Sequence, residues 1–198
     1  MRVLLIGGEG TVGKAAAAGL AHHELIKAGR SSGKVRVDLT DPKSIARMFE
    51  SVGKVDAVVA CTGHTHFGPL ATMTSEQFMK GINDKLMGQV NLVLIGKDHV
   101  NDNGSFTLTS GILDRDPIRQ GANASAVNGA LAAFVLSAAI EMPRGIRINV
   151  VSPGLLQDSA VKYDGFFPGH RPVSNEEVAL GYAKSVDGGI TGKVIAIG

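Results

Sequence analysis

The sequence predicts an α/β fold, a single doubly wound domain with a parallel seven-stranded sheet and helices on both faces. Two observations predict it. Short β-branched runs alternate with longer helical segments along the chain, and several of the runs are apolar at successive positions, as in strands covered on both faces. A chain of 198 residues is long enough for one well-buried core and short for two, and no linker or repeat divides it. We therefore expect residues 1–198 to form one domain.

Seven strands and five helices are predicted in alternation. The strands are residues 3–6, 25–28, 34–37, 57–60, 105–109, 147–151 and 193–197, and the helices are residues 11–21, 41–52, 75–100, 122–142 and 174–186. Two helix starts are well marked. Asp41 precedes Pro42, which suits the first helical position, and Ser174 precedes Glu177 by three residues, as in a capping box.

Composition indicates an ordinary globular protein. Hydrophobic residues make up 44% of the chain and charged residues 19%, and the net charge of +2 comes from scattered Lys and Arg, so we expect no nucleic-acid partner. Cys61 is the only cysteine, which excludes an intramolecular disulfide and a thiolate metal cluster. The apolar stretch LAAFVLSAAI is too short to span a bilayer, so we expect no membrane segment and a cytoplasmic location.

The stretch IGGEGTVGKAAA, residues 6–17, is the most specific local motif. It contains glycines at positions 8, 10 and 13 with dinucleotide-fingerprint spacing, and it lies between a predicted strand and a predicted helix. Such glycines let the backbone turn and approach a pyrophosphate, which then faces the helix N-terminus. The alternative is a tight turn without a ligand. The residues expected to bind the cofactor here are Gly7, Gly10, Thr11, Val12 and Gly13.

The end of the second strand predicts which dinucleotide is bound. An acidic residue there would bind an adenosine ribose, whereas this chain has KAGRSSG at residues 27–33. The guanidinium of Arg30, followed by the hydroxyls of Ser31 and Ser32, suits a 2′-phosphate and so favours NADP (NADPH) over NAD. The alternative is that Arg30 is a solvated loop charge.

The order of motifs along nearly the whole chain resembles the short-chain dehydrogenase/reductase superfamily, which has a Rossmann-type fold. The resemblance rests on GGEGTVG (7–13), VDLTD (37–41), VDAVVACTG (55–63), SFTLTSG (105–111), EMPRGIRINVVSPG (141–154) and TGKVIAIG (191–198). It implies that Ser110 binds the substrate carbonyl. It also implies three sets of cofactor contacts. Asp38 and Leu39 would contact the adenine, and Thr62 and Gly63 the ribose. Pro153, Gly154 and Leu155 would contact the nicotinamide.

The catalytic pair of that superfamily is missing. Its members use a tyrosine as proton donor and a lysine four residues later, and the matching segment here is NASAVNGAL, residues 123–131. One alignment places Ala124 and Asn128 at these positions, and a shift by one residue gives Asn123 and Val127. The sequence therefore resembles an atypical member that lacks the Tyr-x-x-x-Lys dyad.

A lysine stands instead on the preceding helix. Three residues before Gly88, where the superfamily usually has an asparagine, this chain has Lys85, whereas Asn83 faces another side of a regular helix. We expect Lys85 to replace the lost lysine by binding the nicotinamide ribose and lowering the pKa of a neighbouring acid. The alternative is a lysine on an exposed helix face.

Candidate proton donors follow two of the predicted strands, those that end at residues 60 and 109. His64 and His66 follow the strand that ends at residue 60, and we take His64 as a catalytic candidate together with Ser110 and Lys85. Asp114 and Asp116 are further candidates, although a DRDP loop equally suits a turn. No carboxylate or cysteine with ligand spacing accompanies the two histidines, so we expect no metal.

These features together predict an NADP-dependent oxidoreductase that transfers hydride to or from a small carbonyl or alcohol substrate. The alternative is a catalytically inactive NADP(H)-binding sensor or regulatory protein. The segment after Gly154 is loop-like and should shape the substrate pocket. The predicted helix at 122–142 is apolar or small nearly all round, so we expect a homodimer or homotetramer, as the resemblance also implies.

Overall fold

All seven predicted strands are present in the computed structural model, which describes residues 1–198. They form one parallel sheet in the order β3-β2-β1-β4-β5-β6-β7. The strands are β1 (Arg2–Ile6), β2 (Glu24–Gly29), β3 (Val35–Arg36), β4 (Val55–Ala60), β5 (Val100–Thr109), β6 (Arg147–Pro153) and β7 (Val194–Ile197). The strand order reverses between β1 and β4, and doubly wound sheets bind ligands at the carboxyl ends of the strands beside such a reversal.

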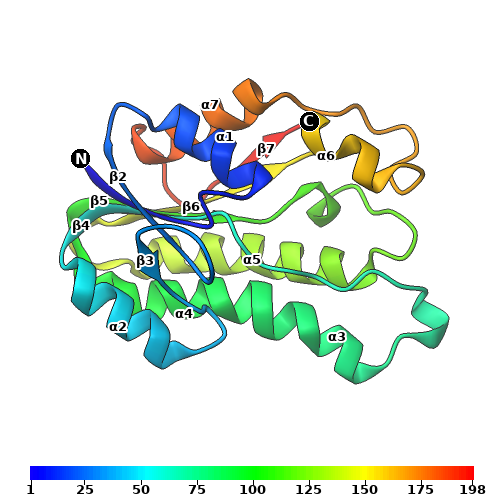
Figure 1. The fold of residues 1–198 in the computed structure, drawn as a ribbon, viewed down its shortest axis with the longest axis horizontal. Coiled ribbons are helices and arrows are strands. Elements are labelled where there is room, and N and C mark those ends of the chain that lie inside the picture. The colour runs from blue at the N-terminus through cyan, green and yellow to red at the C-terminus, as the bar shows by residue number, and fades with distance from the viewer.

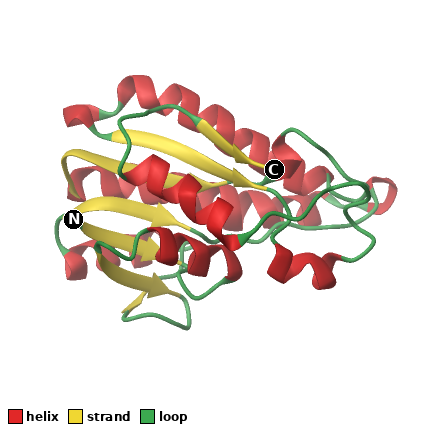
Figure 2. Ribbon diagram, turned by 90° about the horizontal axis from the view of Figure 1, so that it is seen from above, coloured by secondary structure: helices red, strands yellow, loops and turns green.

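Helices cover both faces of the sheet, as predicted (Figure 1). One face carries α1 (Thr11–Gly19) and α7 (Asn175–Val186), and the other carries α2 (Pro42–Val52), α4 (Met87–Gly96) and α5 (Ala122–Glu141). Alternate residues of β1 enter the two cores: Val3 and Leu5 pack beneath α1 and α7, and Leu4 and Ile6 pack beneath the other layer. Figure 2 shows the long loops gathered at the end of the molecule to which the strands point.

Both marked helix starts are confirmed. The Asp41 carboxylate accepts a hydrogen bond from the Lys43 N–H at 2.9 Å, and Pro42 is the first residue of α2. Before α7, the Ser174 hydroxyl accepts from the Glu177 N–H at 3.2 Å, and the Glu177 carboxylate accepts from the Ser174 N–H at 2.7 Å. Both helices therefore begin where local side-chain chemistry predicts.

The segment predicted as one helix over residues 75–100 is helical without interruption as far as residue 99, but it is not a uniform α-helix. The segment consists of α3 (Ser75–Gly81), a π-helical stretch (Ile82–Leu86), α4 and a 3-10 turn, and β5 begins at Val100. The side-chain amide of Asn123 on α5 donates to Phe78 O at 2.6 Å, and the Ile82 N–H bonds to Met79 O, so the α-helical pattern stops there. A π-helical stretch changes the direction in which the following side chains point.

Helix α5 is longer than the apolar stretch singled out in the sequence. It has 20 residues and a mean hydropathy of 1.5 over its most apolar window, so by length and composition it is able to cross a membrane, against our expectation. In the structure it packs along the sheet instead: Val127, Leu131 and Val135 lie in the core, whereas Leu136 and Ile140 are exposed.

We expect the fold to depend on Gln89 of α4, which is fully buried. Its amide accepts from the Thr109 N–H at 2.8 Å and donates to Thr109 O at 2.9 Å, so Gln89→Leu leaves both backbone groups unpaired. The expected loss is about 1–3 kcal/mol of unfolding free energy for each group, measured by urea denaturation. Asn91→Leu in the same helix is the control, because the Asn91 amide makes no hydrogen bond within the protein. Equal losses in both variants would contradict this role.

Candidate active site

Two adjoining cavities lie at the carboxyl ends of the strands. The first, about 350 Å³, is bounded by Gly7, Gly29, Arg30, Ser31, Ser32, Leu39, Thr40, Thr62, Gly63, His64 and Asp84, among others. The second, about 420 Å³, is bounded by residues that include Thr11, Val12, Gly63, Lys85, Ser110, Ala124, Asn128, Pro153, Gly154 and Leu155. Gly63 borders both cavities, so they form two parts of one crevice.

The glycine loop between β1 and α1 fits a pyrophosphate. Gly7 has φ of +77°, and a Cβ on Gly13 would lie 2.0 Å from Gly7 O, so neither position has room for a side chain. Helix α1 begins at Gly10 without a side-chain cap and has no acidic residue in its first turn. Its first N–H groups are therefore available to an anion. Since Gly7 borders the first cavity and Thr11 and Val12 border the second, these N–H groups lie between the two.

Arg30 stands at the rim of the first cavity beside Ser31 and Ser32. Its guanidinium donates to Asp38 Oδ1 at 2.9 Å. Asp38 also accepts from the backbone N–H and the hydroxyl of Thr40, and these two hydrogen bonds, with Arg30, hold its pKa below the ordinary value. Leu39 borders the cavity, whereas Asp38 does not. The rim therefore offers one guanidinium and two hydroxyls to a ligand.

Lys85 reaches the second cavity from the π-helical stretch. Its Nζ donates to Ser110 O at 2.7 Å and to Asn128 Oδ1 at 2.9 Å. The side chain passes over Gly63, where a Cβ would lie 2.5 Å from Lys85 Cγ. Burial lowers the pKa of Lys85 to about 8, while the charge of Asp114 acts in the opposite direction. An ammonium has three donors, so one N–H remains after these two bonds.

Asp114 connects the residues around Ser110. Its Oδ2 accepts from Ser110 Oγ at 3.1 Å and from Ser152 Oγ at 2.8 Å, and its Oδ1 accepts from Arg115 at 2.9 Å. Arg115 also donates to Gly198 O at 2.8 Å. This carboxylate therefore fixes the hydroxyl of Ser110 and supplies a negative charge close to Lys85.

The segment that lacks the catalytic pair lies along the same cavity. Asn128 is the side-chain partner of Lys85, and Ala124 presents only a methyl group. In the alternative alignment, Asn123 has a structural role, since it donates to Phe78 O and accepts from the His66 N–H at 2.8 Å, and Val127 lies in the core. The structure therefore places Ala124 and Asn128, not Asn123 and Val127, at the cavity.

The structure does not bring His64 into the same cavity as Ser110 and Lys85. His64 borders the first cavity, its side chain is 85% exposed, and its Nδ1 lies 3.6 Å from Asp84 Oδ2. His66 borders neither cavity. Of the expected basic groups, only Lys85 therefore borders the same cavity as Ser110.

An aromatic cluster that the sequence did not indicate covers the second cavity. Phe67, Tyr163 and Phe167 border it, and Phe67 and Phe167 lie 6.3 Å and 6.0 Å from Tyr163 between ring centroids. The segment after Gly154 is not simply loop-like, because it contains α6 (Gln157–Ala160) and a 3-10 turn that ends at Tyr163. In the sequence, Phe67 lies in HFG (66–68) and Phe167 in GFF (165–167), but no local pattern indicates that these two segments meet.

Comparisons with known proteins agree with this geometry. A family model described as "Enoyl-(Acyl carrier protein) reductase" matches residues 12–187. A crystal structure of the protein lin1944 from Listeria innocua is 52% identical, with a TM-score of 0.98 and full coverage of both chains. A small-chain dehydrogenase in complex with NADPH is 26% identical over all of this chain and 96% of that one, with a TM-score of 0.87.

A curated protein is also similar to this chain. The tetrahydroxynaphthalene reductase of Pyricularia oryzae is 28% identical over 86% of this chain and 71% of its own length. The family match covers far more than half of the chain and includes most of the residues that border the two cavities, although it begins after Gly7 and Thr11. The protein belongs to the short-chain dehydrogenase/reductase superfamily.

Proposed function

We propose that this protein is an NADP-dependent oxidoreductase that reduces a small, apolar carbonyl compound, with Lys85 as the proton donor. The observation that carries the proposal is the position of the Lys85 ammonium in the second cavity, with two of its three donors used by Ser110 O and Asn128. The third N–H of the Lys85 ammonium remains available as a proton donor, whereas the methyl group of Ala124 has no proton to donate.

The cofactor is the first part of this proposal. Gly7, Gly13 and the open start of α1 would hold a pyrophosphate, and Arg30 with Ser31 would hold a 2′-phosphate. Thr62, Gly63, Pro153, Gly154 and Leu155 would hold the ribose and the nicotinamide. When bound, the cofactor supplies hydride to the substrate. The NADPH found with a superfamily relative supports this choice.

The protein itself supplies the proton for the reduction. The Lys85 ammonium gives one proton to the carbonyl oxygen, becomes a neutral amine and is protonated again by water. Ser110 is less suited to this step because its hydroxyl proton is directed to Asp114, which leaves its oxygen to orient the substrate. Burial raises the pKa of the Cys61 thiol to about 12, so this neighbour stays neutral. Asp114 acts as a positioning residue that favours the charged form of Lys85.

The walls of the second cavity support an apolar, ring-containing substrate. Phe67, Tyr163 and Phe167 offer aromatic faces and edges, which pack well against a planar ring. A curated relative of this chain is a tetrahydroxynaphthalene reductase, which agrees with an aromatic substrate. We therefore expect aryl ketones, aryl aldehydes or quinones to be better substrates than small aliphatic carbonyls.

One observation favours a second function, an NADP(H)-binding sensor or regulatory protein without turnover. Ala124 borders the cavity at the position where the superfamily resemblance implies a tyrosine donor, and its methyl group is no acid. Titration of NADPH and a separate assay of NADPH oxidation with the carbonyl panel distinguish the two. Binding without oxidation of any compound would favour the sensor.

Replacing Arg30 should reduce the preference for NADPH. Arg30→Ala should weaken NADPH binding by about 10-fold and leave NADH binding nearly unchanged. This factor is the lower end of the range for a charge-assisted hydrogen bond, because Arg30 is exposed. Isothermal titration with both cofactors measures this. Arg47→Ala is the control, since Arg47 is also paired with an aspartate at the surface but borders neither cavity. Equal affinity of the parent protein for both cofactors would contradict the assignment of NADP.

Removing the Lys85 ammonium should abolish reduction. Lys85→Met should lower kcat/KM by about 10²- to 10⁴-fold, the usual contribution of a general acid. In the parent protein, reduction should fall as pH rises through about 8, because the ammonium loses its proton there. The assay follows NADPH absorbance with aromatic carbonyls over a range of pH.

Two further variants make the Lys85 test specific. Lys97→Met, at the end of α4 and bonded only to Leu94 O and Asp98, should reduce substrates like the parent. Tyr163→Phe tests the phenolic hydroxyl that borders the cavity. A Lys85→Met protein with parental turnover, or loss of activity in Tyr163→Phe alone, would remove Lys85 as the donor.

We also propose that the protein forms a homodimer or homotetramer through α4 and α5. Their outer faces expose Leu94, Leu136 and Ile140. We expect sedimentation at micromolar concentration to show the oligomer, and Leu136→Lys to shift it toward monomer. Leu180→Lys on α7, an even more exposed leucine on the opposite layer, should leave the oligomer intact. A monomeric parent protein would contradict the proposal.

A further inference from the structure

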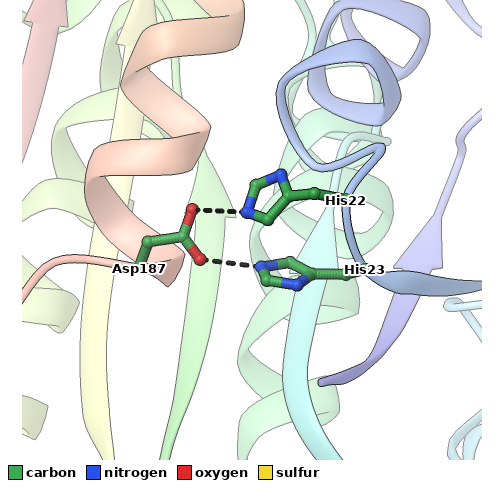
Figure 3. A group of neighbouring side chains, drawn as sticks. All are labelled: His22, His23 and Asp187. Carbon is green, nitrogen blue, oxygen red and sulfur yellow. Dashed lines mark hydrogen bonds and ion pairs between the residues drawn. The ribbon is translucent and has the colours of Figure 1, made fainter.

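Two histidines and an aspartate meet at the end of the sheet opposite the candidate active site. His22 and His23 follow α1, immediately before β2 begins at Glu24, and Asp187 ends α7. Figure 3 shows both rings reaching toward the same carboxylate. His22 Nε2 lies 3.2 Å from Asp187 Oδ2, and His23 Nε2 lies 2.7 Å from Asp187 Oδ1. All of these atoms lie within 4.8 Å of one another.

The cluster is held by the fold and still open to solvent. The His23 N–H donates to Leu20 O at 3.0 Å, and the Asp187 N–H donates to Ala183 O at 2.8 Å, so the backbone is fixed on both sides. Helices α1 and α7 are in close contact, since a Cβ on Gly19 would lie 2.4 Å from Ala179 O. The side chains of His23, Asp187 and His22 are 9%, 35% and 59% exposed. The group is therefore positioned like a site with one accessible side.

Two arrangements can join the rings to Asp187. Each neutral ring can give Asp187 one N–H, and the two ring centroids are then 3.9 Å apart. A single divalent cation instead neutralises the carboxylate and uses the Nε2 lone pairs of both rings, whose protons then reside on Nδ1. The carbonyl end of α7 also favours positive charge. Arg147 is the competing cation: it donates to Ser185 O and Val186 O and is attracted by Asp187.

We propose that His22, His23 and Asp187 bind a divalent transition metal, with Zn²⁺ as the representative ion and water completing its coordination. Two imidazole nitrogens and one carboxylate are ligands that suit Zn²⁺, whereas Mg²⁺ and Ca²⁺ require mostly oxygen. Ligand atoms about 2.0–2.1 Å from zinc lie about 3 Å from each other, the spacing already present between each ring and Asp187. The ion would link the end of α1 to the end of α7. This site is independent of the proposed reductase activity.

Zinc titration of the full-length, tag-free protein tests the proposal. Calorimetry should show one Zn²⁺ bound per chain, and zinc should raise the thermal unfolding midpoint because it binds only the folded protein. Co²⁺ in place of Zn²⁺ should give the visible absorption of a nitrogen- and oxygen-ligated ion. None of these measurements depends on NADPH or on turnover.

Three variants and a matched control locate the ion. His22→Ala, His23→Asn and Asp187→Asn should each raise the Zn²⁺ dissociation constant by at least about 10-fold, the lower limit seen even for groups outside the ligand shell. His64→Asn should bind zinc like the parent, because His64 also faces one carboxylate, Asp84, but has no second ring with it.

Several results would overturn the site. They are no binding at micromolar zinc, an equal loss of affinity in the His64 variant, or unchanged affinity in all three cluster variants. His22 is exposed, so His22→Ala should fold even if the other two variants do not. In that case, unchanged zinc affinity in His22→Ala would also overturn the site.

Discussion

A positive charge held inside the crevice governs the geometry around the candidate active site. An ammonium taken out of water is costly unless its donors are paired. Lys85 meets this demand through Ser110 O and Asn128 Oδ1, with the Asp114 carboxylate nearby. The same demand explains why residue 63 is a glycine, since any Cβ would occupy the path of the lysine side chain. The ends of β4 and β5, the π-helical stretch and α5 therefore meet at one charged group.

Lysine and asparagine have exchanged places relative to the pattern that the superfamily resemblance implies. That pattern has an asparagine on the helix that carries Lys85 here and a lysine on the helix that carries Asn128. The two side chains remain hydrogen-bonded to each other at 2.9 Å. The exchange therefore keeps a cation and an amide in contact while moving the cation to the other helix. In the function proposed above, Lys85, whose pKa is lowered by burial, takes the place of the acid that the resemblance implies.

The topology explains why this fold can carry two separate sites. Parallel strands place their carboxyl ends, and the starts of the following helices, at one edge of the sheet, where a dinucleotide fits. The same rule brings the ends of α1 and α7 together at the other edge. His23 and Asp187 thus become neighbours although 164 residues separate them. A metal at that edge would stabilise the helix pair without touching the crevice.

The sequence by itself determined the fold class, the strands, the helix caps at Asp41 and Ser174, and the glycine loop, because each depends on residues close together in the chain. It also singled out Lys85 and Ser110 as neighbours to be tested. Only the tertiary structure decided where the helix predicted over residues 75–100 changes from α-helical to π-helical geometry, since an amide from α5 takes the Phe78 carbonyl. It also decided that His64 lies apart from Ser110 and that two histidines meet Asp187. Such contacts join segments that are far apart in the chain. They depend on how those segments pack together, and no periodic pattern in the local sequence indicates that packing.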